Sequence, residues 1–349
     1  MIRLPGLARL RPLSRRRLGP PLVVVALCVT AGLYLSPSRA ASARAAAPAR
    51  TVGGLVITVR DVGRSVDFYS RVLLFEKVSD VQTSGADVAR LFGVSGPRVR
   101  VVTMRLGAER LELVEDRGRV SRQTPAEAPR DGRAVARIAL AVNDIEQASL
   151  WLQRQHVQRT TEAPAPDVRQ NTTGVRALSF EDPDGHALEI VEYPAGQGDA
   201  RWQRPTDRVF LGIDHAALVV GDTDESLRFY RDTLGLRVTA RRESDAPEPS
   251  SAGTAGRSRI TTLRGGGGPA IELFESPAPR DARPASHRGS QQTLVVTTDA
   301  KLPVAGAGWS SAENERGTIV SIADATLGFR RGVTALDPDG HRVQLRASR

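Results

Sequence analysis

Residues 214–238, DHAALVVGDTDESLRFYRDTLGLRV, contain a complete strand–helix–strand pattern. Residues 218–220 are apolar and predict a strand, and Asp222 or Thr223 can cap the helix that follows. Gly235 can end this helix, because glycine adopts the left-handed conformation at little cost. Apolar side chains recur with helical spacing at Leu227, Tyr230 and Leu234. The next strand begins directly after the glycine.

The same unit occurs earlier in the chain. Residues 59–69, VRDVGRSVDFY, align with residues 220–230 at an offset of 161 residues. A second motif, Asp-Pro-Asp-Gly-His, occurs at residues 182–186 and again at 337–341, an offset of 155 residues. Two independent motifs that repeat at nearly the same offset indicate a tandem duplication.

Length and charge narrow the function classes. A chain of 349 residues is long enough for about two domains of roughly 150 residues each. The net charge is +10, but residues 1–50 contain nine arginines and no acidic residue. Removing these nine from the 49 basic residues leaves 40 against 39 acidic residues. The rest of the chain has no basic domain, which argues against a nucleic-acid partner.

The first 50 residues resemble an export leader. A basic region ends at Arg17, and an apolar run of 14 residues covers 22–35. This run is short for a membrane span of about 20 residues, which favours a cleaved signal peptide over an N-terminal anchor. A flexible tether follows. We therefore expect a periplasmic or extracellular protein, or one anchored to the membrane by this segment. The single cysteine, Cys28, lies in the leader, so the exported part has no disulfide.

Residues 51–349 predict four modules of the order βαβββ. The first has strands at 52–59, 75–83, 99–106 and 110–115, a helix at 62–73 and a loop at 85–97. The second has strands at 135–142, 157–160, 175–181 and 187–193 and a helix at 144–155. The third covers 212–275, and Gly265–Gly268 predicts a flexible hairpin rather than a phosphate loop. The fourth begins at 292, and its helix should be short or absent because of Pro303, Gly306 and Gly308.

Four such modules, in two halves that each end in Asp-Pro-Asp-Gly-His, resemble the vicinal oxygen chelate superfamily. Its members include glyoxalases, extradiol dioxygenases, fosfomycin-resistance enzymes and bleomycin-binding proteins. The resemblance covers residues 52–347 and implies an α+β fold with two open, eight-stranded, barrel-like domains. We expect residues 51–194 to form the first domain, 195–209 a linker, and 210–349 the second domain.

The resemblance also implies a metal site in the second half. A glyoxalase-like arrangement transfers to His215, Glu272, Gln292 and Gln344, which would hold a divalent ion (Ni, Zn, Mn, Co or Fe). Glu272 would be the catalytic base, because Gln344 has no titratable group. The matching positions of the first half are Gly54, Glu112, Arg137 and Glu189. Gly54 offers no ligand and Arg137 is a permanent cation, so the first half should be degenerate.

Two functions follow from the resemblance. The first is a metal-dependent lyase or isomerase acting on a small oxygen-rich molecule in the second half. The alternative is a metal-free protein that binds and sequesters a small molecule, as bleomycin binders do. His215 could instead be a hydrogen-bonded cleft residue, and Glu272 could pair with an arginine. We expect His186 and His341, on the hairpin turns, to be exposed to solvent.

The expected partners are few. They are a small-molecule ligand, no nucleic acid, and a membrane only through an uncleaved leader. The chain could act as a monomer or a homodimer, since four modules in one chain can pair internally.

Overall fold

The computed structural model describes residues 50–117, 135–157, 168–170, 173–244, 258–275, 292–298, 319–323 and 325–347. The predicted leader and the predicted break in the fourth helix both lie outside these ranges, as does most of the strand expected at 157–160. Within the described ranges, no helix is long and apolar enough to cross a membrane.

The four predicted modules are present, and we number them along the chain. Module 1 contains β1 (Thr51–Val59), α1 (Val62–Asp67), the π-helical turn η1 (Phe68–Val72), β2 (Glu76–Ser84), α2 (Ala86–Phe92), β3 (Arg98–Leu106) and β4 (Glu109–Asp116). Module 2 contains β5 (Val135–Val142), α3 (Ile145–Arg154), β6 (Arg169–Gln170), β7 (Arg176–Glu181) and β8 (Ala187–Glu192).

Module 3 repeats the βαβββ order, and module 4 repeats its four strands, while its helix position lies outside the described residues. Module 3 contains β9 (Phe210–Val220), α4 (Thr223–Leu227), the π-helical turn η3 (Arg228–Thr233), β10 (Arg237–Ser244), β11 (Ser258–Arg264) and β12 (Ala270–Glu275). Module 4 contains β13 (Gln292–Thr298), β14 (Val320–Ser321), the 3₁₀ turn η5 (Ala325–Leu327), β15 (Arg331–Leu336) and β16 (Arg342–Ala347). The segment expected as a linker contains a further 3₁₀ turn, η2 (Ala200–Gln203).

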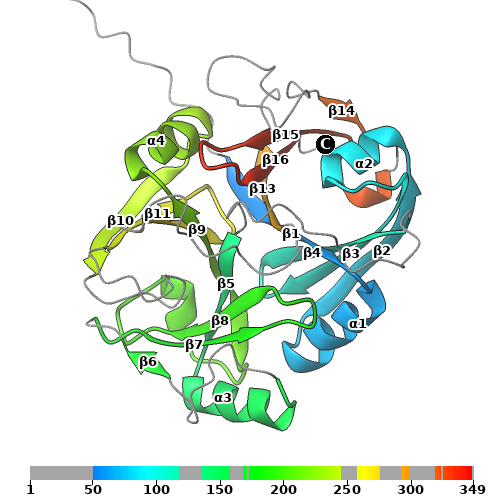
Figure 1. The fold of residues 1–349 in the computed structure, drawn as a ribbon. Coiled ribbons are helices and arrows are strands. Elements are labelled where there is room, and N and C mark those ends of the chain that lie inside the picture. Colours follow the sequence, from blue (N-terminus) through cyan, green and yellow to red (C-terminus); the bar gives the residue numbers. More distant parts are fainter. Residues whose placement is uncertain are drawn as a thin grey trace, which may run out of the picture. The chain divides into compact units, whose positions relative to one another are not determined.

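The modules pair into two eight-stranded sheets, but not half by half (Figure 1). Sheet A has the order β14-β15-β16-β13-β1-β4-β3-β2 and joins modules 1 and 4. Sheet B has the order β10-β11-β12-β9-β5-β8-β7-β6 and joins modules 2 and 3. The expectation that residues 51–194 and 210–349 each close their own sheet is therefore wrong. The reason is that β1 pairs antiparallel with β13 at the centre of sheet A, and β5 with β9 at the centre of sheet B.

The first Asp-Pro-Asp-Gly-His motif forms a buried clamp between modules 1 and 2. Asp182 accepts hydrogen bonds from the hydroxyl of Tyr69 at 3.1 Å and from the backbone N–H groups of Asp184 and His186 at 2.8 and 2.9 Å. The ring Nδ1 of His186 lies 2.7 Å from the same carboxylate. Although burial favours the neutral acid, these bonds and His186 lower the pKa of Asp182. We call this set the Asp182 clamp.

The second motif repeats this arrangement between modules 3 and 4, and we call it the Asp337 clamp. Asp337 accepts a hydrogen bond from the hydroxyl of Tyr230 at 2.9 Å, and the ring Nδ1 of His341 lies 2.7 Å away. Burial again opposes ionisation, but His341 and the surrounding donors lower the pKa of Asp337. Both clamps depend on a tyrosine from the helical segment of the odd-numbered module.

The clamps correct the prediction for the two motif histidines. His186 and His341 are 1% and 2% exposed, whereas their place on hairpin turns predicts exposure to solvent. Each hairpin folds onto the helix of the neighbouring module, and the aspartate holds the ring inside. The sequence of a turn does not reveal which other segments of the chain pack over it, so burial of the two histidines could not be predicted from the motif.

The clamps also connect the two sheets. Tyr69 follows a strand of sheet A, whereas Asp182 lies between two strands of sheet B. In the Asp337 clamp the order is reversed, because Tyr230 follows a strand of sheet B and Asp337 lies between two strands of sheet A. The two halves of the sequence therefore meet through the sheets, while helix–hairpin contacts join the two modules within each half.

The glycine run between β11 and β12 has a structural reason. The backbone N–H of Val52 donates to the carbonyl of Gly267 at 3.1 Å. A Cβ atom on Gly268 would lie 1.7 Å from the carbonyl oxygen of Val52, so no other residue fits there. Gly107, 161 residues earlier, is in the same position, because its Cβ would lie 2.4 Å from the carbonyl of Leu211. The predicted hairpin is present, and its glycines allow close approach of another backbone.

The clamps predict matched losses of stability. Tyr69→Phe and Tyr230→Phe should each lower the free energy of unfolding by about 1–3 kcal/mol, because each leaves a buried carboxylate short of one donor. Arg71→Ala is the control: Arg71 forms a solvent-exposed ion pair with Asp67, so its loss should change stability by less than about 1 kcal/mol. Urea unfolding of the three variants measures these changes. Equal, negligible losses in all three would mean that the clamps do not hold the modules together.

Candidate small-molecule site

The sheets regroup the eight positions that the sequence analysis singled out. Sheet B brings together residues of β5, β8, β9 and β12, namely Arg137, Glu189, His215 and Glu272. Sheet A receives the other four, on β1, β4, β13 and β16: Gly54, Glu112, Gln292 and Gln344. This corrects the expectation of one shared centre in residues 210–349. His215 and Glu272 meet, whereas Gln292 and Gln344 lie in the other sheet.

A β-bulge positions His215. The register of β9 against β5 passes from Ile213 to His215 and leaves Asp214 without a partner strand residue. A bulge redirects successive side chains, and here the Oδ2 atom of Asp214 lies 2.8 Å from Nδ1 of His215. The other ring nitrogen, Nε2, lies 3.3 Å from Oε2 of Glu272. His215 is 4% exposed, and the imidazole therefore lies between two carboxylates.

Asp214 is itself held by two aromatic side chains. It accepts hydrogen bonds from the hydroxyl of Tyr193 at 2.7 Å and from the indole Nε1 of Trp202 at 2.5 Å. Burial opposes the charge, but the bonds from His215, Tyr193 and Trp202 lower the pKa of Asp214. Trp202 comes from η2, in the segment expected to be a simple linker. Its contribution to the site could not be recognised from the polar composition around it.

Glu272 is neutralised from several sides. It is 5% exposed, and the Nη1 and Nη2 atoms of Arg242 lie 3.2 and 3.3 Å from its two oxygens. Thr262 donates a further hydrogen bond at 3.1 Å. Burial raises the pKa of this carboxyl group, but the charges of His215, Arg242 and Arg137 outweigh it and lower the pKa. For His215, burial lowers the pKa, but Glu272 and Asp214 outweigh it and raise the pKa.

The second ion pair of the site is equally buried. Nε of Arg137 lies 2.9 Å from Oε2 of Glu189, and the two residues are 8% and 5% exposed. The permanent cation that the sequence places at position 137 therefore neutralises a carboxylate of the same sheet.

Sheet A has its own arginine. Arg346 donates to both oxygens of Glu112, at 2.5 and 2.8 Å, and also to Oε1 of Gln344. The amide nitrogen of Gln344 donates to the carbonyl of Leu91 at 2.7 Å. Both ends of this amide are therefore occupied by the protein itself, and Gln344 is fully buried.

Helix α2 covers this part of sheet A, in a segment where the sequence predicts only a loop at 85–97. A helical signal is present there, because Val88, Leu91 and Phe92 have helical spacing and Gly93 adopts the left-handed conformation that ends a helix. These apolar residues pack on Val56, Val101 and other residues of sheet A.

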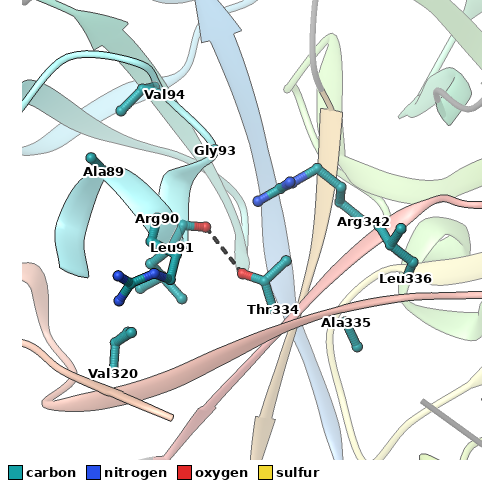
Figure 2. Close-up of a pocket in the computed structure, with 10 residues that line it drawn as sticks. All are labelled: Ala89, Arg90, Leu91, Gly93, Val94, Val320, Thr334, Ala335, Leu336 and Arg342. Atoms are coloured by element: carbon teal, nitrogen blue, oxygen red, sulfur yellow. Dashed lines mark hydrogen bonds between the residues drawn. The ribbon is translucent and has the colours of Figure 1, made fainter. Parts of the chain in front are cut away.

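A cavity of about 250 Å³ lies beside α2 (Figure 2). The hydroxyl of Thr334 on β15 donates to the carbonyl of Leu91 at 3.1 Å at its wall. Its lining residues are Ala89, Arg90, Leu91, Gly93, Val94, Val320, Thr334, Ala335, Leu336 and Arg342. All belong to modules 1 and 4, so this cavity is separate from the charged pairs of sheet B.

The donor sets do not fit a metal centre with four protein ligands. In the described part of the chain, no group of three or more His, Cys, Asp or Glu side chains is arranged to hold an ion. In sheet B, Arg137 occupies one of the four positions and already pairs with Glu189. In sheet A, Gly54 has no side chain that could bind a metal, and Arg346 donates hydrogen bonds to Glu112 and Gln344. Metal centres need neutral or anionic donors, and a guanidinium is neither.

Comparisons with known proteins agree with this fold. The profile of the Glyoxalase/Bleomycin resistance protein/Dioxygenase superfamily matches residues 51–190 and 212–345. An iron-dependent extradiol dioxygenase of Rhodococcus jostii (strain RHA1) is 38% identical over 65 residues, which cover 18% of this chain and 21% of that enzyme. The chain therefore matches only about a fifth of the length of this relative.

Two solved structures match most of the chain. The structure of glyoxalase I from Zea mays has a TM-score of 0.54 and is 16% identical, covering 86% of this chain and 92% of that one. The structure of a putative dioxygenase from Bacillus subtilis subsp. subtilis str. 168 has a TM-score of 0.51 and is 15% identical, covering 86% of each chain. At this level of identity the similarity establishes the fold only.

The contact between His215 and Glu272 predicts a coupled titration. Glu272→Gln should lower the pKa of His215, because it removes a negative charge within ion-pair distance. Glu112→Gln, in sheet A, should leave the pKa of His215 unchanged. Ring-proton NMR against pH measures both. A pKa of His215 that is the same in the two variants would show that the buried pair does not form.

Proposed function

Because the chain belongs to the Glyoxalase/Bleomycin resistance protein/Dioxygenase superfamily, we propose that it binds a small polar molecule at the His215–Glu272 pair of sheet B. The observation that carries this proposal is the buried, interconnected set of charges on one face of the sheet. Burying a charge costs several kcal/mol per ion even when the charge is paired, so buried ion pairs contribute little net stability to the fold. Perturbed titratable groups of this kind concentrate at functional sites.

The titration of the pair favours binding over proton abstraction. A general base works best when its pKa lies near the working pH. The pKa of Glu272 is lowered below its ordinary range, so this carboxylate is a weak proton acceptor. Burial lowers the pKa of His215, but the charges of Glu272 and Asp214 outweigh it and raise the pKa, which favours the protonated ring. A protonated imidazole and the guanidinium of Arg242 are suited to hold the oxygen atoms of a ligand.

A lyase or isomerase acting on a small oxygen-rich molecule is the second candidate. The geometry around His215 favours it, since Asp214 binds Nδ1 and leaves Nε2 directed at Glu272. Ligating histidines are commonly oriented by a carboxylate in this way. Glu272 would then be the acid–base group. The guanidinium of Arg137 at a ligand position weighs against the metal-dependent form of this activity.

Export is a separate part of the proposal. The basic and apolar composition of residues 1–50 supports a leader that directs the domain out of the cytoplasm. The absence of cysteine beyond Cys28 is compatible with either redox environment. Detection of the mature N-terminus by mass spectrometry would show whether the leader is removed.

Ligand binding predicts a change in melting temperature. At a concentration of 100 times its Kd, a ligand stabilises the folded chain by about 2.7 kcal/mol. We expect at least one compound from a panel of small carboxylates, hydroxyketones and catechols to raise the Tm of the full chain. His215→Gln should abolish this rise, whereas Glu112→Gln should retain it.

Two outcomes of this experiment would contradict the proposal. One is a panel in which no compound raises the Tm of the wild-type chain. The other is a rise that is unchanged in His215→Gln, since the binding site would then lie elsewhere. If a bound compound is also converted, the second candidate is favoured, and Glu272→Gln should stop conversion while binding persists.

A further inference from the structure

The four positions of sheet B form two parallel rows across the sheet. Ala139 pairs with His215 on one side and with Glu189 on the other. Ala217 pairs with Arg137 on one side and with Glu272 on the other. Residues paired across neighbouring strands lie on the same face of a sheet, as do residues two apart on one strand. All four polar side chains therefore share one face, and a small alanine side chain separates the two members of each row.

Arg137 interacts electrostatically with both Glu189 and Glu272 on this face. It lies 2.9 Å from Glu189 and belongs to the same row as Glu272. Its charge also contributes to the lowered pKa of Glu272. Two buried carboxylates need a cation, because an uncompensated charge in a protein interior is strongly destabilising. Arg137 supplies a permanent charge next to Glu189, and it adds to the charges of Arg242 and His215 at Glu272.

In sheet A an arginine also neutralises a glutamate, but this arginine comes from a different strand. Its glutamate, Glu112, is held by Arg346, which lies on the last strand of module 4 rather than the first strand of module 2. The planar guanidinium engages both oxygens of the carboxylate. Sheet B carries two such pairs, Arg137 with Glu189 and Arg242 with Glu272, and sheet A carries Arg346 with Glu112. In both sheets, therefore, arginine side chains neutralise the glutamates at these positions.

We propose that the guanidinium of Arg137 takes the place of a divalent metal ion in sheet B, so that this face is a metal-free site with an internal cation. This inference goes beyond ligand binding and is independent of it, because it is tested by metal content alone. The remaining three positions hold one imidazole and two carboxylates, which are donors for Co²⁺, Ni²⁺ or Zn²⁺. Arg242 also pairs with Glu272, but its side chain is 42% exposed, so a bound ion can displace it into solvent. A single substitution that removes the guanidinium and adds a donor should therefore create a metal site.

The test uses the full chain and Co²⁺ as the probe. After dialysis against Co²⁺, the wild-type chain should retain far less than one ion per chain, whereas Arg137→His should retain about one and gain the visible absorption of protein-bound Co²⁺. Arg137→His combined with Glu272→Gln should lose the ion again. Arg137→Lys keeps a cation at this position and should retain no ion.

A matched control tests whether any added histidine suffices. Gln292 lies 155 residues after Arg137 and takes the equivalent place in sheet A. Gln292→His should retain no Co²⁺, since Arg346 occupies Glu112 and Gln344 there and is buried, unlike the half-exposed Arg242 of sheet B. Circular dichroism and urea unfolding show which variants fold. If Arg137→His does not fold, Arg137→Gln is measured in the same way, because its amide oxygen is a weaker donor of similar reach.

Two results would overturn the inference. The first is a wild-type chain that retains one Co²⁺ ion, with the ion lost in His215→Ala. The second is a folded Arg137→His or Arg137→Gln variant that retains no more Co²⁺ than the wild-type chain. Failure of the ligand panel described above would leave this result unaffected, so the two proposals stand or fall separately.

Discussion

The fold depends on two buried aspartates, Asp182 and Asp337, that remain ionised inside the protein. Each carboxylate receives a tyrosine hydroxyl, a histidine ring and backbone N–H groups, and these together outweigh the cost of burial. The donors come from different modules, so the charge is stable only when the hairpin of one module lies on the helix of the module before it. The aspartates therefore constrain how the four modules assemble, and each sheet must accommodate that constraint.

Buried carboxylates that are paired with donors or cations also occupy the central face of sheet B. Asp214, Glu189 and Glu272 are nearly inaccessible to solvent, and each is matched by a donor or cation from a neighbouring strand or turn. The bulge in β9 makes this possible, because it lets His215 contact Asp214 and Glu272 at once. A face built in this way is polar, preorganised and electrically balanced. These properties are the basis for the proposed binding of a small polar molecule.

The duplication has produced two different sheets from one pattern. In sheet A, helix α2 covers the central face, and the carbonyl of Leu91 binds Gln344. In sheet B, η2 contributes Trp202 beside Asp214, and the charged pairs remain together. The contrast shows how equivalent positions diverge once the connecting segments differ. Each half of the chain contributes one module to each sheet. Metal ligands predicted from a single half, such as His215 and Gln344, therefore lie in different sheets.

The local patterns of the chain were sufficient to identify four βαβββ modules, most of their strand boundaries, and Arg137 as a cation at a ligand position. These features depend on residues close in sequence, so periodicity and side-chain chemistry reveal them. The pairing of module 1 with 4 and of module 2 with 3 was decided by the tertiary structure. Repeats with the same pattern offer equivalent edges, and only long-range contacts such as β1 with β13 and the buried clamps distinguish them. The burial of His186 and His341 was decided in the same way, since it depends on a helix from another module.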